Sequence, residues 1–236
     1  MRLDKFLSIT KTLSRKETAL AIKRQQIFVN NKPATNKEQL VDINNDKIMY
    51  NNNLIKYTEF IYLMLNKPKG YVSSTDDPRD KTVLELLPNE YTKFNLFPCG
   101  RLDKDTTGLV ILTNNGKSAH ALLLPKNHVS KTYFFEIADP ITLENIEKIE
   151  NGIELRDGYI TKPCKIQMLT STTGNITIVE GKYHEIKRMF GAVHNKIIEL
   201  KRLSFSSIIL DPKLKEGEFR PLNSEEVKVF ENILKS

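Results

Sequence analysis

The sequence predicts an α+β protein with two domains, a small one at the N-terminus and a larger one with a mainly antiparallel sheet flanked by helices. Two observations lead to this expectation. Apolar segments of strand length alternate irregularly with fewer helical patterns, which is typical of α+β folds and unlike a doubly wound α/β fold. Residues 1–58 carry a net charge of +6, whereas residues 59–236 carry +1. We therefore expect one domain over 1–58 and another over 59–236.

Two helical patterns open the small domain. Apolar residues spaced three and four apart predict the first helix: Leu3, Phe6 and Leu7. Ser14 and Glu17 have the spacing of a capping box, which predicts the start of the second helix. The buried stripe of that helix is expected from Ala19, Leu20 and Ile22. Its exposed faces are expected to carry the basic residues Arg15, Lys16, Lys23 and Arg24.

Short strands follow these helices. The apolar segment 27–29 predicts a strand, residues 30–33 a turn, and residues 46–48 another strand. The asparagine run 51–53 and the ten residues after it are expected to form the linker to the larger domain.

The larger domain shows longer apolar segments. Strands are predicted over 61–65, 109–113, 133–137 and 176–179, with one or two more within 197–209. Helices are predicted around 82–87, 116–124, 142–150 and 184–193.

The composition and the missing motifs exclude several classes of protein. The excess positive charge of the first quarter points to a polyanionic partner. Gly116-Lys117-Ser118 resembles the end of a phosphate-binding P-loop, but position 111 is isoleucine where that loop needs glycine. The two cysteines and four histidines lack metal-ligand spacing. Since no segment predicts a signal peptide or a membrane span, we expect a cytoplasmic monomer without a nucleotide, metal or other cofactor.

A polar loop between apolar segments, residues 97–109, is the strongest candidate for chemistry. Gly100 and Gly108 bracket it, and the apolar run that follows would hold it rigidly on a strand. Asp103 lies among cationic residues, so that it could act as an ionised catalytic carboxylate. The spacing alone favours a turn in which Asp103 caps backbone amides.

Four motifs in this part of the chain resemble those of RNA pseudouridine synthases, and they occur in the family's order. Residues 100–109 match the signature Gly-Arg-Leu-Asp-x-x-Thr-x-Gly-Leu, which surrounds the catalytic aspartate. Residues 65–71 resemble the first family motif, and 131–133 the Lys-x-Tyr motif. Residues 180–190 resemble the last motif.

Further segments resemble the RsuA type, which acts on small-subunit rRNA: residues 73–78, 155–165 and 217–222. Residues 1–58 resemble the alpha-L RNA-binding domain found in a ribosomal small-subunit protein and in tyrosyl-tRNA synthetase. Gln26 and Ser206-Ser207 depart from the family pattern, which usually has glycine at these places.

The resemblance implies a cofactor-free isomerisation of uridine to pseudouridine in 16S rRNA, by family analogy at uridine 516. It assigns the catalytic role to Asp103, ion pairing with that aspartate to Lys187, and stacking on the uracil to Tyr133. Leu102, Ile186 and Leu203 are expected in the pocket wall. RNA contacts are expected from Arg101, Lys67, Lys182, Arg188 and Arg202, and from the four basic residues of the second helix. The partner would be rRNA, within a small-subunit assembly particle.

Two alternatives stay open at this point. The enzyme could modify a large-subunit (23S) rRNA uridine instead. The chain could also be a ribosome-assembly factor that binds RNA without catalysis. A glycosidase that uses Asp103 and Asp105 is a weaker third possibility, because the sequence has no tryptophan to stack on a sugar.

Overall fold

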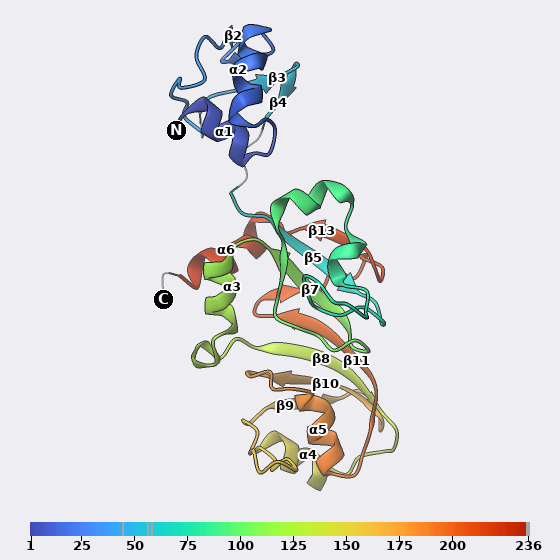
Figure 1. The fold of residues 1–236 in the computed structure, drawn as a ribbon. Coiled ribbons are helices and arrows are strands. Elements are labelled where there is room, and N and C mark those ends of the chain that lie inside the picture. Colours follow the sequence, from blue (N-terminus) through green and yellow to red (C-terminus); the bar gives the residue numbers. More distant parts are fainter. Residues whose placement is uncertain (44, 56, 58, 235–236) are drawn as a thin grey trace. The chain divides into compact units, whose positions relative to one another are not determined.

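A computed structural model describes residues 1–43, 45–55, 57 and 59–234, and these divide into two compact units. The first unit is Met1–Glu59 and the second is Phe60–Ser236 (Figure 1). Residue 58, where we expected the first domain to end, lies outside the described residues. The division between the units falls after Glu59.

The first unit packs two helices against a small antiparallel sheet. Its elements are α1 (Leu3–Ile9), α2 (Arg15–Lys23), β1 (Ile27–Val29), β2 (Lys32–Pro33), β3 (Ile48–Tyr50) and β4 (Asn53–Leu54), with strand order β2-β1-β3-β4. The predicted capping box is confirmed: Ser14 Oγ accepts from the Glu17 amide, and the Glu17 carboxylate accepts from the Ser14 amide. The core contains the three apolar residues that predicted α1, each at most 2% exposed.

Two expectations for this unit are wrong. Leu20 of α2 is 55% exposed, and Thr18 and Ala21 are buried instead, because residues three apart on a helix share a face. The asparagine run is not a linker: Asn51 and Asn52 form the turn of the β3–β4 hairpin, and Asn53 begins β4. Asn51 and Asn52 have φ values of 48° and 63°, and consecutive positive φ values are what a tight type I′ hairpin requires.

The second unit is built on a nine-stranded sheet of the described residues. Seven strands follow the path β13-β5-β7-β11-β8-β10-β9, and off this path β6 pairs with β7 and β12 with β11. Its strands are β5 (Tyr62–Lys67), β6 (Phe97–Cys99), β7 (Thr107–Thr113), β8 (Lys131–Ile137), β9 (Lys165–Met168), β10 (Thr173–Ile178), β11 (Ile197–Phe205), β12 (Ile208–Ile209) and β13 (Phe219–Pro221). The β7–β11 pair is parallel, and the other described pairs in this sheet are antiparallel. The predicted α+β class with a mainly antiparallel sheet is confirmed.

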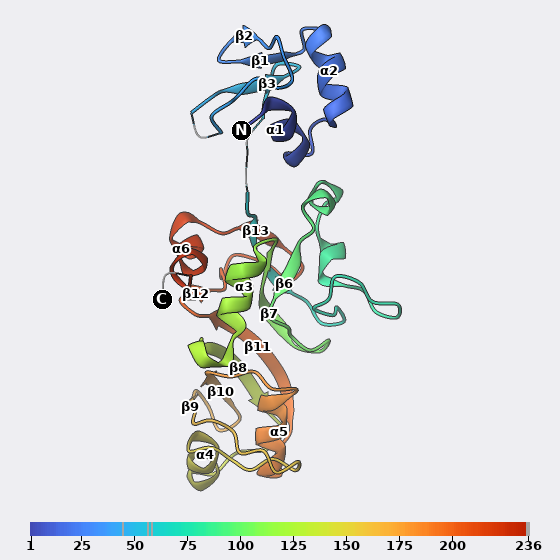
Figure 2. The ribbon, with the colours of Figure 1, turned by 60° about the vertical axis from the view of Figure 1, so that its left-hand side comes forward.

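Helices cover both faces of this sheet (Figure 2). The helices are α3 (Gly116–Leu123), α4 (Leu143–Glu150), α5 (Glu185–Ala192) and α6 (Ser224–Asn232), with 3₁₀ turns η1 (Val83–Leu86), η2 (Asn89–Phe94) and η3 (Pro125–Asn127). Buried residues of α4 and α5 join one core cluster, and those of α3 and α6 join the other. Because both faces are covered, every residue of β7 is buried.

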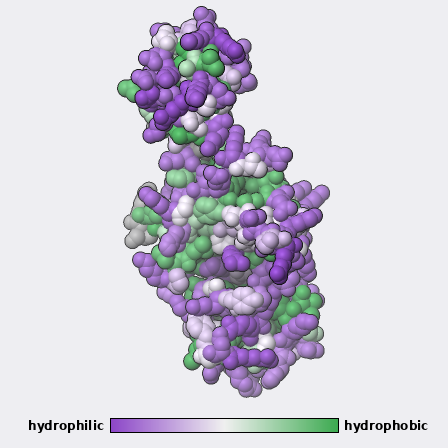
Figure 3. Space-filling view, viewed as in Figure 1, coloured by the Kyte–Doolittle hydropathy of each residue, from purple (hydrophilic) through white to green (hydrophobic). Residues whose placement is uncertain are grey.

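The surface of each unit is largely hydrophilic. On the face drawn in Figure 3, hydrophilic side chains predominate and hydrophobic ones show as scattered patches. In the part of the chain that the structure describes, no helix combines the length and apolar character needed to cross a membrane.

The two departures from the family's glycine pattern have different outcomes. Gln25, not Gln26, has the positive φ (54°) after α2. Ser206 has a φ of 54° at the turn between β11 and β12, so a non-glycine residue holds a left-handed conformation there.

Candidate active site

Asp103 lies in the loop between β6 and β7, just before β7 pairs in parallel with β11. Gly108, the second residue of β7, has a φ of +98° and lies opposite Arg202 of β11. A Cβ at position 108 would lie 2.3 Å from the Arg202 carbonyl oxygen, which explains why this position must be glycine. The close approach of β7 and β11 therefore fixes the C-terminal end of the loop.

Buried polar groups hold the rest of the loop in place. Ser73 Oγ accepts from the Leu102 amide at 3.0 Å and donates to the Leu102 carbonyl at 3.2 Å. Lys67 Nζ donates to the carbonyls of Pro68, Lys104 and Thr106, at 3.1, 3.2 and 2.7 Å. The backbone on both sides of Asp103 is thus anchored to the last residue of β5 and to the segment that follows it.

Lys187, on the first turns of α5, lies between two carboxylates of this loop. Its Nζ is 3.0 Å from Asp103 Oδ2 and 2.6 Å from Asp105 Oδ1. The predicted Lys187–Asp103 ion pair is confirmed, and the sequence did not reveal that Asp105 shares the same lysine. A further neighbour is His184, whose Nε2 lies 3.4 Å from Asp103 Oδ1.

The charges of this cluster reinforce one another. Burial raises the pKa of Asp105, but the hydrogen bond and charge of Lys187 outweigh it and hold that pKa below its ordinary value. Burial likewise disfavours the charged form of Lys187. The two aspartates outweigh this effect of burial and raise the pKa of Lys187. Lys187 therefore stays cationic beside Asp103.

A small cavity of about 70 Å³ opens at this cluster. Asp103 and Lys187 line it together with Tyr133, which projects from β8 and is 7% exposed. Leu102 and Ile186 line the cavity as expected, but Leu203 does not. Leu203 falls at an irregularity in the pairing of β11 with β8, and Leu200 lines the wall instead.

The expected RNA-binding residues occupy different settings. Arg101 and Lys182 are exposed and line the cavity. Arg188 is half-buried and forms an ion pair with Asp157. In the first unit, the four basic residues of α2 and its C-terminal end are all exposed: Arg15, Lys16, Lys23 and Arg24.

Two of those expectations need correction. Lys67 is fully buried, and its ammonium is directed to backbone carbonyls, so that it supports the Asp103 loop and has no surface to offer RNA. Its burial lowers its pKa to about 8. Arg202 is 1% exposed, with Nε donating to the Leu109 carbonyl at 2.6 Å, so it is no surface contact either.

A buried carboxyl pair lies beside the cavity and was not predicted. Burial, together with a hydrogen bond to Glu180, raises the pKa of Glu185 to about 8. Glu180 accepts from Tyr159 Oη at 2.6 Å and from the Lys162 amide at 2.8 Å. Glu185 accepts from the Lys182 amide at 2.7 Å. The pair therefore fixes the segment 180–186 that carries His184 to the cavity.

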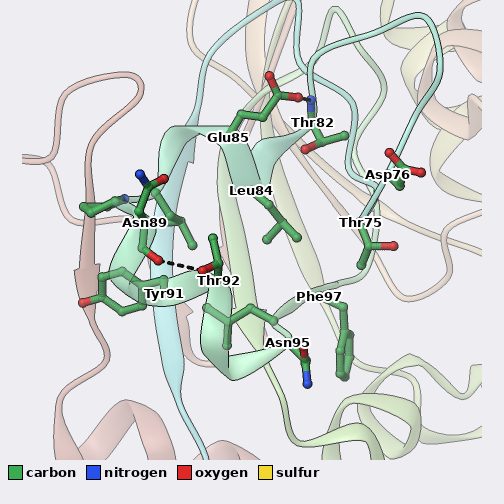
Figure 4. Close-up of a pocket in the computed structure, with 13 residues that line it drawn as sticks. Thr75, Asp76, Thr82, Leu84, Glu85, Asn89, Tyr91, Thr92, Asn95 and Phe97 are labelled. Atoms are coloured by element: carbon green, nitrogen blue, oxygen red, sulfur yellow. Dashed lines mark hydrogen bonds between the residues drawn. The ribbon is translucent and has the colours of Figure 1, made fainter. Parts of the chain in front are cut away.

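A larger cavity, about 820 Å³, lies away from this site around η1 and η2 (Figure 4). Among the described residues its lining includes the carboxylates Asp76 and Glu85 but no lysine or arginine. It contains none of the predicted site residues. No group of His, Cys, Asp or Glu among the described residues could hold a metal ion.

One known protein family matches most of the second unit. The family described as RNA pseudouridylate synthase matches residues 61–192, which include the Asp103 loop, Tyr133 and Lys187. The chain belongs to the RNA pseudouridine synthase family. The resemblance seen in the motifs is thereby confirmed.

Relatives match almost the whole chain. An "uncharacterized RNA pseudouridine synthase YtzG" of Bacillus subtilis (strain 168) is 45% identical over 234 residues, covering 98% of each chain. The "ribosomal small subunit pseudouridine synthase A" of Escherichia coli (strain K12) is 39% identical, covering 96% of this chain and 98% of the other. A crystal structure of a pseudouridylate synthase is 37% identical with a TM-score of 0.69, and the match covers 98% of this chain and 99% of the other. The chain is an RNA-modifying isomerase of the RsuA type.

Proposed function

We propose that this pseudouridine synthase converts one uridine of small-subunit (16S) rRNA, by family analogy uridine 516, with Asp103 as its catalytic carboxylate. The observation that carries the proposal is the Asp103–Lys187 ion pair at 3.0 Å, in a cavity that Tyr133 also lines. The name of the Escherichia coli relative supports the small subunit as the source of the substrate.

The reaction breaks the bond between ribose C1′ and uracil N1, turns the base, and joins C1′ to C5. Asp103 can act at the sugar as a nucleophile or as a general base, and both roles need the ionised carboxylate. Lys187 stabilises that ionised form through its ammonium. Tyr133 presents its ring to the same cavity, where it can stack on the uracil and assist the removal of the C5 proton.

The target nucleotide must leave its stack to reach Asp103, at a cost of a few kcal/mol for a paired base. Arg101 is exposed at the cavity mouth, and its planar guanidinium suits a phosphate contact or a wedge in the RNA. We assign general electrostatic binding of rRNA to the first unit, as an alpha-L RNA-binding domain, through the basic residues of α2. We further propose that the enzyme acts as a monomer in the cytoplasm, on rRNA within a small-subunit assembly particle.

The test is a map of pseudouridines in rRNA from a strain that lacks the gene, made by carbodiimide modification and reverse transcription. We expect one 16S rRNA stop to disappear, and to return when the wild-type gene, but not the Asp103→Asn variant, is supplied. Loss of a 23S rRNA stop would instead identify a large-subunit enzyme. An unchanged map would leave only the RNA-binding assembly role.

A further inference from the structure

A basic cleft adjoins the reactive cavity. The cleft has a volume of about 410 Å³, and four residues line both spaces: Arg101, Tyr133, Gly181 and Lys182. The reactive cavity alone, at about 70 Å³, is much the smaller of the two. The cleft and the reactive cavity are therefore adjacent spaces.

The charge of the cleft is strongly positive. Five cationic residues line it: Arg101, Lys131, Lys162, Lys182 and Arg202. Glu180 is the carboxylate in its lining, and its two oxygens already accept from Tyr159 Oη and from the Lys162 amide. Glu180 also interacts with the Glu185 carboxyl, so that its charge is largely satisfied within the protein.

Two of the cations lie deep, and one has an unused donor. Arg202 is 1% exposed, and its Nη2 has no hydrogen-bond partner among the described residues, although Nε is bound to the Leu109 carbonyl. Leaving a buried charged donor unsatisfied is costly, so a site like this favours an acceptor. The nearby Lys131 is half-buried, and its Nζ donates to the Val129 carbonyl at 2.8 Å.

The cationic groups also act on each other. Burial lowers the pKa of Lys131 to about 8, and the adjacent Arg202 charge contributes to the lowering. An anion between the two would relieve this repulsion. A phosphate suits the cleft better than a base does, because these side chains offer donors only and a phosphate offers acceptors only.

We propose that the basic cleft binds a backbone phosphate of the substrate RNA, on a nucleotide next to the one that enters the reactive cavity, with Lys131 and Arg202 as the deep ligands. This inference rests on the proposed function for the identity of the RNA. It gives Lys131 of the Lys-x-Tyr motif a role that is separate from that of Tyr133. It also assigns Arg202 an RNA contact inside the cleft, in place of the surface contact that its burial rules out.

The experiment pairs one protein charge with one RNA charge. The probe is the shortest 16S rRNA fragment that the wild-type protein binds, made with a neutral methylphosphonate at one position at a time around the target uridine. Binding is measured for the wild type, for Lys131→Met, and for Lys117→Met, which removes an exposed lysine of α3 outside the cleft.

For the wild type, we expect methylphosphonate at one position beside the target to weaken binding about tenfold. Lys131→Met should weaken binding of the natural fragment by a similar factor. In this variant, methylphosphonate at the same position should cause no further loss of affinity. Lys117→Met should behave as the wild type does. If the losses from Lys131→Met and from methylphosphonate multiply at every position, the cleft does not bind a backbone phosphate.

Two further arms keep the outcome clear. If Lys131→Met fails to fold, Lys131→Gln, which keeps a polar side chain but removes the charge, should show the same coupling, and no coupling in either variant overturns the proposal. Inorganic phosphate should bind far more weakly than the RNA fragment. If inorganic phosphate binds as tightly as the fragment and methylphosphonate has no effect, the cleft serves a free anion. Conversion of the natural fragment by the wild type is scored separately, so failure of the proposed reaction leaves the binding result readable.

Discussion

Lys187 Nζ lies 3.0 Å from Asp103 Oδ2, joining the first turns of α5 to the loop between β6 and β7. The same ammonium lies even closer to Asp105, at 2.6 Å. The two aspartates differ in exposure, because the Asp105 side chain is 70% exposed and that of Asp103 is 29% exposed. Asp103 is thus the carboxylate that the cavity encloses, and Asp105 is a surface partner of its lysine.

This difference predicts unequal effects of substitution. Asp103→Asn should lower turnover by at least about a thousandfold while rRNA binding stays within a few-fold, because an amide can be neither nucleophile nor base at the ribose. Asp105→Asn, the matched control, should retain turnover within about tenfold. Single-turnover release of tritium from [5-³H]uridine-labelled rRNA measures both. Equal losses in the two variants would contradict the assignment of the reaction to Asp103.

Lys187→Met should lower kcat in the same tritium-release assay by about a hundredfold with little change in KM, because the Asp103 carboxylate loses the cation beside it. Lys104→Met provides the control, since Lys104 pairs with Asp80 outside the cavity. An equal loss of kcat in Lys187→Met and Lys104→Met would contradict a specific action of Lys187 on the Asp103 carboxylate.

The buried Glu185 predicts a dependence of stability on pH. Its pKa is raised to about 8, whereas an unfolded glutamate titrates near 4.3, so the folded state holds an extra proton between these values. The free energy of unfolding should therefore fall as pH rises from about 5 to 8. Glu185→Gln cannot ionise, and it should flatten this decline and raise Tm at pH 8.5 by at least about 2 °C. Thermal unfolding at pH 5.5 and 8.5 tests this, with Glu90→Gln as an exposed control that should follow the wild type.

The basic face of α2 predicts a salt effect. Replacing Arg15, Lys16, Lys23 and Arg24 with glutamine should weaken rRNA binding and lower the slope of log affinity against log salt, by about 0.7–0.9 for each phosphate that the variant no longer neutralises. The matched control replaces four other exposed lysines of the first unit: Lys11, Lys32, Lys37 and Lys47. The same weakening in both sets would show that the unit's total charge matters and the α2 face does not.

Gly108 and Gly116 predict opposite responses to alanine. Gly108→Ala should destabilise the protein by about 2–4 kcal/mol, because its Cβ would strike the Arg202 backbone and the φ of +98° disfavours a side chain. Gly116 begins α3 with open space around it, so Gly116→Ala should be neutral or stabilising by up to about 1 kcal/mol. Urea unfolding of the two variants compares them, and similar stabilities would be inconsistent with a close β7–β11 approach at Gly108.

Local patterns in the sequence are enough to predict the fold class and most elements around the site, and the resemblance to the pseudouridine synthase motifs adds the Asp103–Lys187 pair. Those patterns are apolar periodicity, the capping box at Ser14, and a loop motif whose chemistry needs particular residue types. The hairpin at Asn51 and the exposed Leu20 could not be predicted in this way, because an asparagine run and an apolar helix residue each fit two environments equally well.

The positions of the cations depend on the tertiary structure. A lysine or arginine in a sequence looks like a surface charge, yet Lys67 and Arg202 are buried, since the backbone carbonyls that accept from them come from segments distant in the chain. The Glu180–Glu185 pair and the cleft beside Tyr133 arise in the same way. The burial of an ionisable side chain and its hydrogen-bond and ion-pair partners depend on which segments the sheet brings together. This long-range packing, and not the residue type, sets the charge and the role of each group.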